Sequence, residues 1–181
     1  MPLSHLADID ENILARAARV RLACFDVDGT LTDGRLFYDD AGRESKAFHI
    51  HDGQGLVLLR RAGIEVALIT ARTSPAAERR ARELGVRIHV DVKDKLAQVD
   101  ALCGELGIGR DEVSFMGDDL PDQPPFRAVG LAIAPADAHA WTARHAHWRT
   151  RNRAGAGAAR EACDLLLASQ GHLDGFFGDD A

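Results

Sequence analysis

The sequence predicts a three-layer α/β fold, in which helices cover both faces of a doubly wound parallel sheet. Short apolar runs rich in β-branched residues alternate along the chain with longer stretches of helical periodicity. Glycines follow several of the helical stretches, where left-handed C-caps are expected. Strands that alternate with helices form parallel β-α units, and these units bury both faces of a sheet.

The expected elements follow one another from residue 20 onward. Strands are expected at residues 20–25, 65–69, 86–90, 113–116 and 131–134. Helices are expected at residues 55–62, 75–84, 95–106, 121–129 and 157–169. One segment breaks this alternation: residues 35–49 predict a β-hairpin, inserted after the first strand, that turns at residues 40–42.

The chain length sets the expected domain organisation. A chain of 181 residues suffices for one domain and leaves no room for a second domain. We expect an N-terminal extension over residues 1–19 with a short amphipathic helix at 12–18, and a core over residues 20–170. Residues 171–181 are rich in Gly and Asp and predict a mobile tail.

Composition argues against several classes of protein. The net charge is −6, with 28 acidic and 22 basic residues, whereas a nucleic-acid binder needs a basic face. No apolar run approaches the roughly 20 residues that span a membrane. The first ten residues lack a secretory apolar segment, so we expect a cytoplasmic protein. The three cysteines are far apart and show no metal or redox spacing.

Two carboxylates follow the first expected strand, at the edge of the sheet where ligands bind in open α/β folds. They are Asp26 and Asp28, and Gly29 permits the sharp turn that would bring them together. One carboxylate could attack phosphorus, while the other could give and take a proton at the ester oxygen. A plain Asp-Gly turn is the alternative, which we favour for the dipeptide alone but not for the whole stretch 26–30.

A hydroxyl and several cations follow the second and third expected strands. Thr70 could hold a phosphate oxygen, and Arg72 could bind a substrate anion through its planar fork. Lys95 begins a helix, where a cation opposes the helix dipole; a phosphate-facing role would explain it. A solvated surface lysine is the alternative, and Lys93 is a second candidate for the phosphate-facing role.

Three acids crowd the end of the fourth expected strand. Asp118, Asp119 and Asp122 would repel one another unless a cation compensates their charge. Carboxylate oxygens with room for water and phosphate suit Mg²⁺. The alternative is an acidic helix N-terminus, which accounts for Asp122 better than for the other two.

The order of these motifs resembles that of the haloacid dehalogenase superfamily of phosphohydrolases, whose Rossmann-like sheet the resemblance implies. The matching stretches are residues 26–30, Thr70, Lys95 and residues 117–122. The resemblance implies that Asp26 is a nucleophile forming an aspartyl-phosphate and that Asp28 is the general acid and base. It implies that Thr70 and Lys95 stabilise the transferred phosphoryl group. The implied Mg²⁺ ligands are Asp26, Asp28 through its carbonyl, and Asp118, with Asp119 in support.

Further segments resemble a capless subclass of this superfamily, at residues 33–36, 46–53, 69–72, 136–139, 160–166 and 170–174. The resemblance implies hydrolysis of 3-deoxy-D-manno-octulosonate 8-phosphate in lipopolysaccharide precursor synthesis. It also implies a homotetramer in which the hairpin of one subunit covers the neighbouring active site, with no nucleic acid or membrane as partner. The implied substrate-binding residues are Asp28, His49, Ile50, His51, Asp52, Gly53, Arg72, Arg80, Lys95 and Asp119.

The chain departs from the usual pattern of these relatives at several positions. His51, Val57 and Ala156 stand where relatives commonly carry arginine, and Ala71 replaces a common glycine. Arg153 could substitute for the arginine missing at Ala156. These changes affect the expected substrate contacts and leave the catalytic set complete.

Three other functions stay open at this point. A phosphatase of nine-carbon sugar-acid phosphates, such as acylneuraminate 9-phosphate, would share the capless tetramer, and only a substrate panel separates the two. A phospho-accepting receiver is disfavoured, because it would carry its acid pair after the first strand and its phosphorylated aspartate after the third. A catalytically dead scaffold is disfavoured because every expected catalytic position is filled.

Overall fold

Parallel β-α units build the core of the protein, as the sequence predicts. The computed structural model describes residue 6 and residues 8–177. All neighbouring strands of its six-stranded sheet are parallel, in the order β5-β4-β1-β6-β7-β8. The strands are β1 (Leu22–Phe25), β4 (Glu65–Ile69), β5 (Arg87–His89), β6 (Val113–Met116), β7 (Leu131–Ala134) and β8 (Trp148–Arg149).

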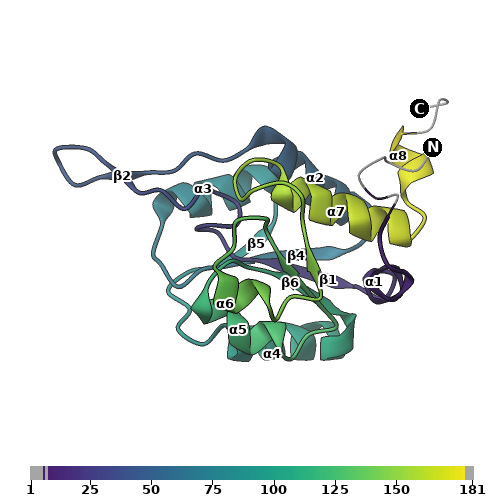
Figure 1. Ribbon diagram of the computed structural model, residues 1–181. Coiled ribbons are helices and arrows are strands. Elements are labelled where there is room, and N and C mark those ends of the chain that lie inside the picture. Colours follow the sequence, from purple (N-terminus) through teal and green to yellow (C-terminus); the bar gives the residue numbers. More distant parts are fainter. Residues whose placement is uncertain (1–5, 7, 178–181) are drawn as a thin grey trace.

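The sheet lies between two helical layers (Figure 1). A hydrophobic cluster packs between the sheet and each layer. One layer holds α1 (Glu11–Ala17), α2 (Ile50–Arg61), α3 (Pro75–Leu84) and α7 (Ala158–Ser169). The other holds α4 (Lys95–Leu106), α5 (Gln123–Phe126) and α6 (Ala140–Ala143). Alternate residues of β1 serve the two clusters, because successive side chains of a strand point to opposite faces. The two-sided burial explains the continuous apolar runs of the central strands.

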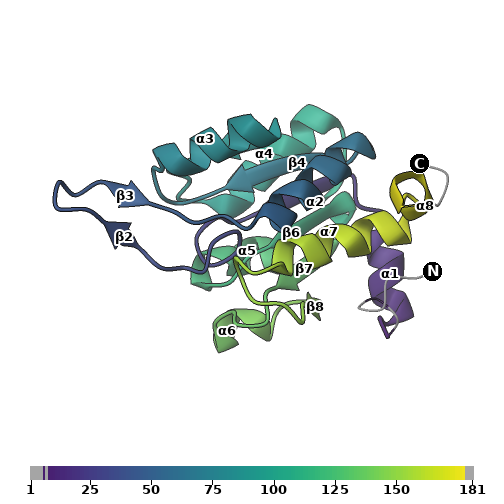
Figure 2. The ribbon, with the colours of Figure 1, turned by 90° about the horizontal axis from the view of Figure 1, so that it is seen from above.

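Strand β1 lies in the interior of the sheet, and later parts of the chain add strands on both of its sides. The chain first builds β4 and β5 on one side of β1, and later β6, β7 and β8 on the other. This reversal creates a crevice at the carboxyl ends of β1, β4 and β6, which is where open α/β sheets bind ligands. The hairpin formed by β2 (Phe37–Tyr38) and β3 (Glu44–Ser45) projects away from the core at this end (Figure 2).

The structure corrects the predicted bounds of two helices. Helix α2 begins at Ile50 rather than at residue 55 and contains Gly53 and Gly55. A Cβ on Gly55 would lie 3.0 Å from Cys163 Sγ, so this glycine permits close packing of α2 on α7. The helix predicted over 121–129 is a 3₁₀ turn at Leu120–Asp122 followed by the four residues of α5. Prolines in this stretch lack the N–H groups of a longer helix.

The chain ends outside the core differ partly from prediction. The helix expected at 12–18 is α1. The predicted mobile tail includes a helix, α8 (Leu173–Phe177), in which Leu173 and Phe176 pack against the first hydrophobic cluster. Residues 178–181 of that tail, and residues 1–5 and 7 of the extension, lie outside the described part of the chain. A short 3₁₀ turn, Arg110–Glu112, precedes β6. In the described part, no helix has the length and apolar character needed to cross a bilayer.

Candidate active site

Asp26 lies at the centre of the crevice, directly after β1. Its backbone N–H donates to the carbonyl of Met116 at 2.8 Å, which fixes the residue against β6. Its buried carboxylate meets Lys95, whose Nζ lies 2.8 Å from Asp26 Oδ1. Lys95 is the first residue of α4 and is buried, whereas the Lys93 side chain is 76% exposed and pairs with Asp91. Of the two candidate lysines, the structure therefore brings Lys95 to the site.

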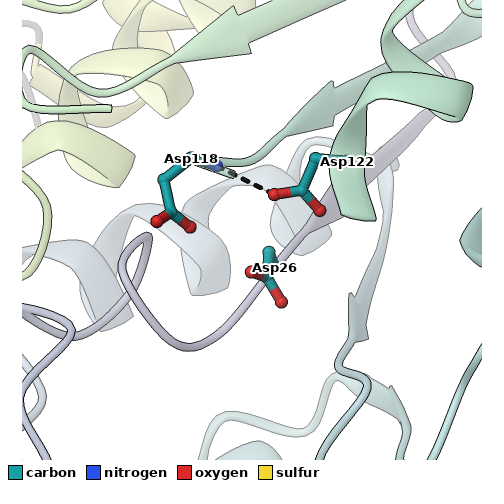
Figure 3. Close-up of side chains that lie close together, drawn as sticks. All are labelled: Asp26, Asp118 and Asp122. Carbon is teal, nitrogen blue, oxygen red and sulfur yellow. Dashed lines mark hydrogen bonds between the residues drawn. The ribbon is translucent and has the colours of Figure 1, made fainter. Parts of the chain in front are cut away.

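Asp118 and Asp122 face Asp26 from the loop after β6 (Figure 3). Asp122 Oδ2 accepts hydrogen bonds from the backbone N–H groups of Asp118 at 2.9 Å and Asp119 at 3.2 Å. Asp122 Oδ1 accepts from Lys95 Nζ at 2.6 Å. A Cβ on Gly117 would lie 2.3 Å from Asp122 Cγ, so a residue without a side chain is needed there. Asp122 thereby shapes the loop that carries Asp118.

The donor set of these three acids fits a hard divalent cation. Oxygens of Asp26, Asp118 and Asp122 lie within 4.8 Å of one another. Burial, followed by repulsion from Asp122, raises the pKa of Asp26 to about 8 and that of Asp118 to about 7. Added positive charge would restore the ionised form of both acids, and oxygen-rich sites of this kind suit Mg²⁺.

The predicted ligand set of Asp26, Asp28 and Asp118 differs in one member from this carboxylate cluster. The Asp28 carboxylate points to the hairpin instead and pairs with Lys46 through Oδ1. Its Oδ2 lies 3.9 Å from Arg72 Nε. The carboxylate is thus absent from the cluster, as it would be if only the Asp28 carbonyl bound a metal. Both oxygens of Asp122 are engaged by Lys95 and the backbone, which is the arrangement of a supporting acid.

A sharp turn after β1 allows Asp26 and Asp28 to border one cavity. Gly29 has a φ of 81°, in the left-handed region that favours glycine. A Cβ on Gly29 would lie 2.2 Å from Asp118 Oδ2, so the turn also needs glycine for space. The hydroxyl of Thr30 donates to Asp118 Oδ1 at 3.3 Å and ties the turn to the loop after β6.

The resulting cavity has a volume of about 330 Å³. Its lining residues are Asp26, Asp28, Gly29, Gly34, Thr70, Ala71, Arg72, Lys95, Asp118, Asp119, Pro121 and Asp122. The structure therefore brings together every residue predicted to be catalytic. It also brings Arg72 and Asp119 of the predicted substrate set to the same cavity, from the loops after β4 and β6.

The remaining predicted substrate residues, His49 to Gly53 and Arg80, do not reach this cavity within one chain. Asp52 is buried, and its carboxylate accepts hydrogen bonds from the backbone N–H groups of Gly157 at 3.3 Å and Arg160 at 2.8 Å. It therefore holds the start of α7 against α2. His49, Gly53 and Arg80 line a separate small cavity. Ile50 is 78% exposed.

Sequence reasoning misses two parts of the site. One is the supporting contact of Asp122, which the sequence shows only as a third acid in the Asp118 motif. The other is Lys46, which is buried between Asp28 and Glu44. The composition offers a signal for Lys46, because only three of the 22 basic residues are lysines. The side chains of two of these three, Lys46 and Lys95, are buried at this site.

Comparison with known proteins extends over almost the whole chain. A scan against models of protein families found no match. The 3-deoxy-D-manno-octulosonate 8-phosphate phosphatase of Yersinia pestis is 40% identical over 171 residues, which are 94% of this chain and 91% of the relative. The phosphatase of the same name from Escherichia coli K12 is 40% identical over 167 residues, 92% of this chain and 89% of the relative.

Solved structures agree with this fold along nearly their full length. A hypothetical protein from Xanthomonas campestris superimposes with a TM-score of 0.94 at 60% identity, covering 97% of this chain and 96% of the other. A 3-deoxy-D-manno-octulosonate 8-phosphate phosphatase from Moraxella catarrhalis, in complex with a magnesium ion, a phosphate ion and KDO, gives a TM-score of 0.92 at 37% identity. That match covers 96% of this chain and 100% of the other.

Proposed function

The chain belongs to the family of 3-deoxy-D-manno-octulosonate 8-phosphate phosphatases in the haloacid dehalogenase superfamily, and we propose that Asp26 is its nucleophile. It is a magnesium-dependent phosphomonoester hydrolase that releases phosphate and the free sugar acid from 3-deoxy-D-manno-octulosonate 8-phosphate. The assignment of roles to the site residues rests on their position around one cavity. Asp26, Asp28, Thr70, Lys95 and Asp118 all border it.

The reaction divides into two half-reactions. In the first, a carboxylate oxygen of Asp26 attacks phosphorus, the bond from phosphorus to the ester oxygen breaks, and Asp28 gives that oxygen a proton. In the second, Asp28 takes a proton from a water molecule whose oxygen attacks the phosphorus of the aspartyl-phosphate. The Asp26 carboxylate is then free again, and phosphate leaves.

The negative charge of the transferred phosphoryl group opposes attack by the Asp26 carboxylate. The site therefore surrounds Asp26 with hydrogen-bond donors and positive charge. Lys95 contacts the nucleophile directly and is held on its other side by Asp122. Thr70 offers a hydroxyl from the end of β4. The cofactor Mg²⁺, when held by Asp26, Asp118 and the Asp28 carbonyl, supplies further neutralisation of the phosphoryl oxygens.

Recognition of the sugar acid falls to two further residues that border the cavity, Arg72 and Asp119. Arg72 lies beside Asp28 and pairs with Glu44 of the hairpin, so an incoming carboxylate would compete with Glu44 for its guanidinium. Asp119 offers a carboxylate that can accept hydrogen bonds from sugar hydroxyls. The names of the relatives favour an eight-carbon substrate. No feature of the cavity favours the nine-carbon alternative.

The assembly proposed here is a homotetramer in which each hairpin covers a neighbouring site. Support comes from the hairpin itself, which extends away from its own core (Figure 2). It also exposes Leu36, Phe37 and Tyr38, which would lose their water contact against another subunit. The contacts implied for His49 to Gly53 and Arg80 stay predictions, as does the cytoplasmic location.

A substrate panel with a nucleophile variant tests the function. Wild-type protein should release phosphate through many turnovers with Mg²⁺, fastest from 3-deoxy-D-manno-octulosonate 8-phosphate, and Asp26→Asn should release none. Asp91→Asn is the matched control, because Asp91 also follows a strand but is exposed and outside the cavity. Its φ of 55° is one that asparagine tolerates.

Each contrary result has a distinct meaning. Equal or faster turnover of acylneuraminate 9-phosphate would replace the eight-carbon assignment. Phosphate retained once per chain without turnover would indicate a receiver-like protein. Full activity in a correctly folded Asp26→Asn variant would overturn the assignment of the nucleophile.

A further inference from the structure

We propose that Lys46 of the hairpin positions Asp28 for proton transfer, an inference that rests on the role of Asp28 in the proposed function. Lys46 follows β3, and its side chain is 1% exposed. Its ammonium pairs with Asp28 Oδ1 and lies 2.8 Å from Glu44 Oε1. A buried ammonium is costly unless it is paired, so both acids are needed to hold it there.

The two oxygens of the Asp28 carboxylate have different surroundings. Oδ1 carries the contact with Lys46. Oδ2 is buried and accepts no hydrogen bond from any residue that the structure describes, although Arg72 Nε lies 3.9 Å away. The anchored Oδ1 fixes the plane of the carboxyl group, and Oδ2, the oxygen without a hydrogen bond, exchanges the proton with a ligand in the cavity that Asp28 borders. Lys46 thereby determines which oxygen is left to exchange the proton.

Lys46 is itself held by a chain of contacts that reaches back to the core. Glu44 pairs with Lys46 through Oε1 and with Arg72 through Oε2. The hydroxyl of Tyr38 lies 3.4 Å from Glu44 Oε2, and it accepts from Arg72 Nη2 at 3.4 Å. The hairpin stem is therefore fixed to the loop after β4, and this is why a hairpin residue can orient a residue of the β1 turn.

A lysine suits this position better than an arginine. Its single nitrogen carries three donors and can bridge two carboxylates at one point, whereas arginine spreads its five donors over a rigid planar fork. The chain uses arginine at 19 of its 22 basic positions, yet it places a lysine here. Lysine at position 46 thus fits a site that requires one compact positive charge between Asp28 and Glu44.

The effect of Lys46 should depend on the leaving group. An alkyl ester needs a proton from Asp28 on its departing oxygen as the bond to phosphorus breaks. A p-nitrophenyl ester leaves as a stable phenolate and needs none in that half-reaction. Both esters give the same aspartyl-phosphate, which needs Asp28 to take a proton from water in the second half-reaction. Misplacement of a catalytic group costs about 10²-fold in rate, and the cost should fall only on the steps that use this proton.

The test compares full-length wild type with Lys46→Met in Mg²⁺. With p-nitrophenyl phosphate, the initial burst of nitrophenolate should be nearly as fast as in wild type, and the steady rate after it should be slow. With 3-deoxy-D-manno-octulosonate 8-phosphate, the single-turnover rate should fall about 10²-fold. Lys46→Arg should show the same selective loss to a smaller degree. Lys93→Met is the control, because this lysine is exposed and, among the described residues, its ammonium contacts Asp91 and the carbonyl of Ala71.

Other outcomes overturn the proposal. An equal loss with both esters in the rate of the first half-reaction, or a raised KM with an unchanged single-turnover rate, would show that Lys46 only supports the hairpin or binds substrate. If Lys46→Met does not fold, a leaving-group-independent loss in Lys46→Arg leads to the same conclusion. A wild-type protein that hydrolyses neither ester would refute the proposed function. An active wild type with an unaffected Lys46→Met would refute the role of Lys46 alone.

Discussion

The Nζ atom of Lys95 lies 2.6 Å from Oδ1 of Asp122, and both side chains are buried. Burial alone would lower the pKa of Lys95, but the neighbouring Asp26 and Asp122 raise it, and the net pKa lies above its usual value. Lys95 is therefore positively charged beside Asp26, the proposed nucleophile. Because Asp122 also binds two backbone N–H groups of the loop after β6, one acid fixes both this cation and the loop that bears Asp118.

Replacement of Asp122 by asparagine should destabilise the protein. An amide has one oxygen, so in either orientation its NH₂ group faces donors, either Lys95 or the backbone N–H groups of Asp118 and Asp119. Buried donors left without an acceptor cost about 1–3 kcal/mol each. Urea unfolding should therefore show a lower free energy of unfolding for Asp122→Asn. Asp111→Asn, at an exposed acid, is the control, and equal stability of the two variants would contradict this interpretation.

The residues that meet at the cavity can be predicted because of one topological rule. Parallel strands end at the same edge of a sheet, so residues that directly follow β1, β4 and β6 must meet there. This rule places Asp26, Thr70 and Asp118, and Lys95 stands out because a cation is unfavourable at a helix start. None of these inferences needs knowledge of a loop conformation.

The parts that escape prediction depend on contacts between distant segments. The role of Asp122 requires a loop path that only Gly117 permits, and no local pattern reveals that path. The reach of Lys46 to Asp28 requires the hairpin stem to be fixed by Arg72. The early start of α2 reflects packing of Gly55 against α7, which overrides the low helix propensity of glycine.

Magnesium should raise the thermal stability of the protein, and Asp118→Asn should abolish most of this effect. A cation that binds only the folded state stabilises it by mass action, by about 2.7 kcal/mol at a concentration 100 times its Kd. Thermal unfolding in increasing Mg²⁺ measures the shift. Asp91→Asn should respond as wild type does, because that acid lies outside the cluster. An undiminished shift in Asp118→Asn would remove Asp118 from the metal site.

Polar substitution of Phe37 should weaken the proposed tetramer. Phe37 lies on β2 and is 50% exposed, so burial of its exposed half against a neighbour is worth less than the ~1.5–3 kcal/mol of a fully exposed side chain. Light scattering should therefore give a smaller mass for Phe37→Ser than for wild type at low protein concentration. Asp40→Ser, at the exposed turn of the same hairpin, should keep the mass of wild type. A fully active wild-type monomer would disprove the shared site.

Acid should destabilise the protein through His147. The backbone N–H of Ala132 in β7 donates to His147 Nδ1 at 2.8 Å, so this nitrogen must be unprotonated. Burial, and then the charge of Arg16, lower the pKa of His147 below the ordinary value of a histidine. The unfolded chain therefore binds a proton more readily than the folded protein. Stability should be retained above the ordinary histidine pKa of about 6.5 and should fall as the pH drops below it.

The comparison of wild type with His147→Asn isolates this contribution. The asparagine oxygen can accept from Ala132 without titrating. Urea unfolding at about pH 7.5 and about pH 5.5 should show a smaller loss of stability in the variant than in wild type, by at most about 1.4 kcal/mol per pH unit for one proton. Burial also lowers the pKa of His89, but that residue is present in both proteins and its effect cancels. Parallel losses in the two proteins would show that the bond to Ala132 does not control the acid sensitivity of β7.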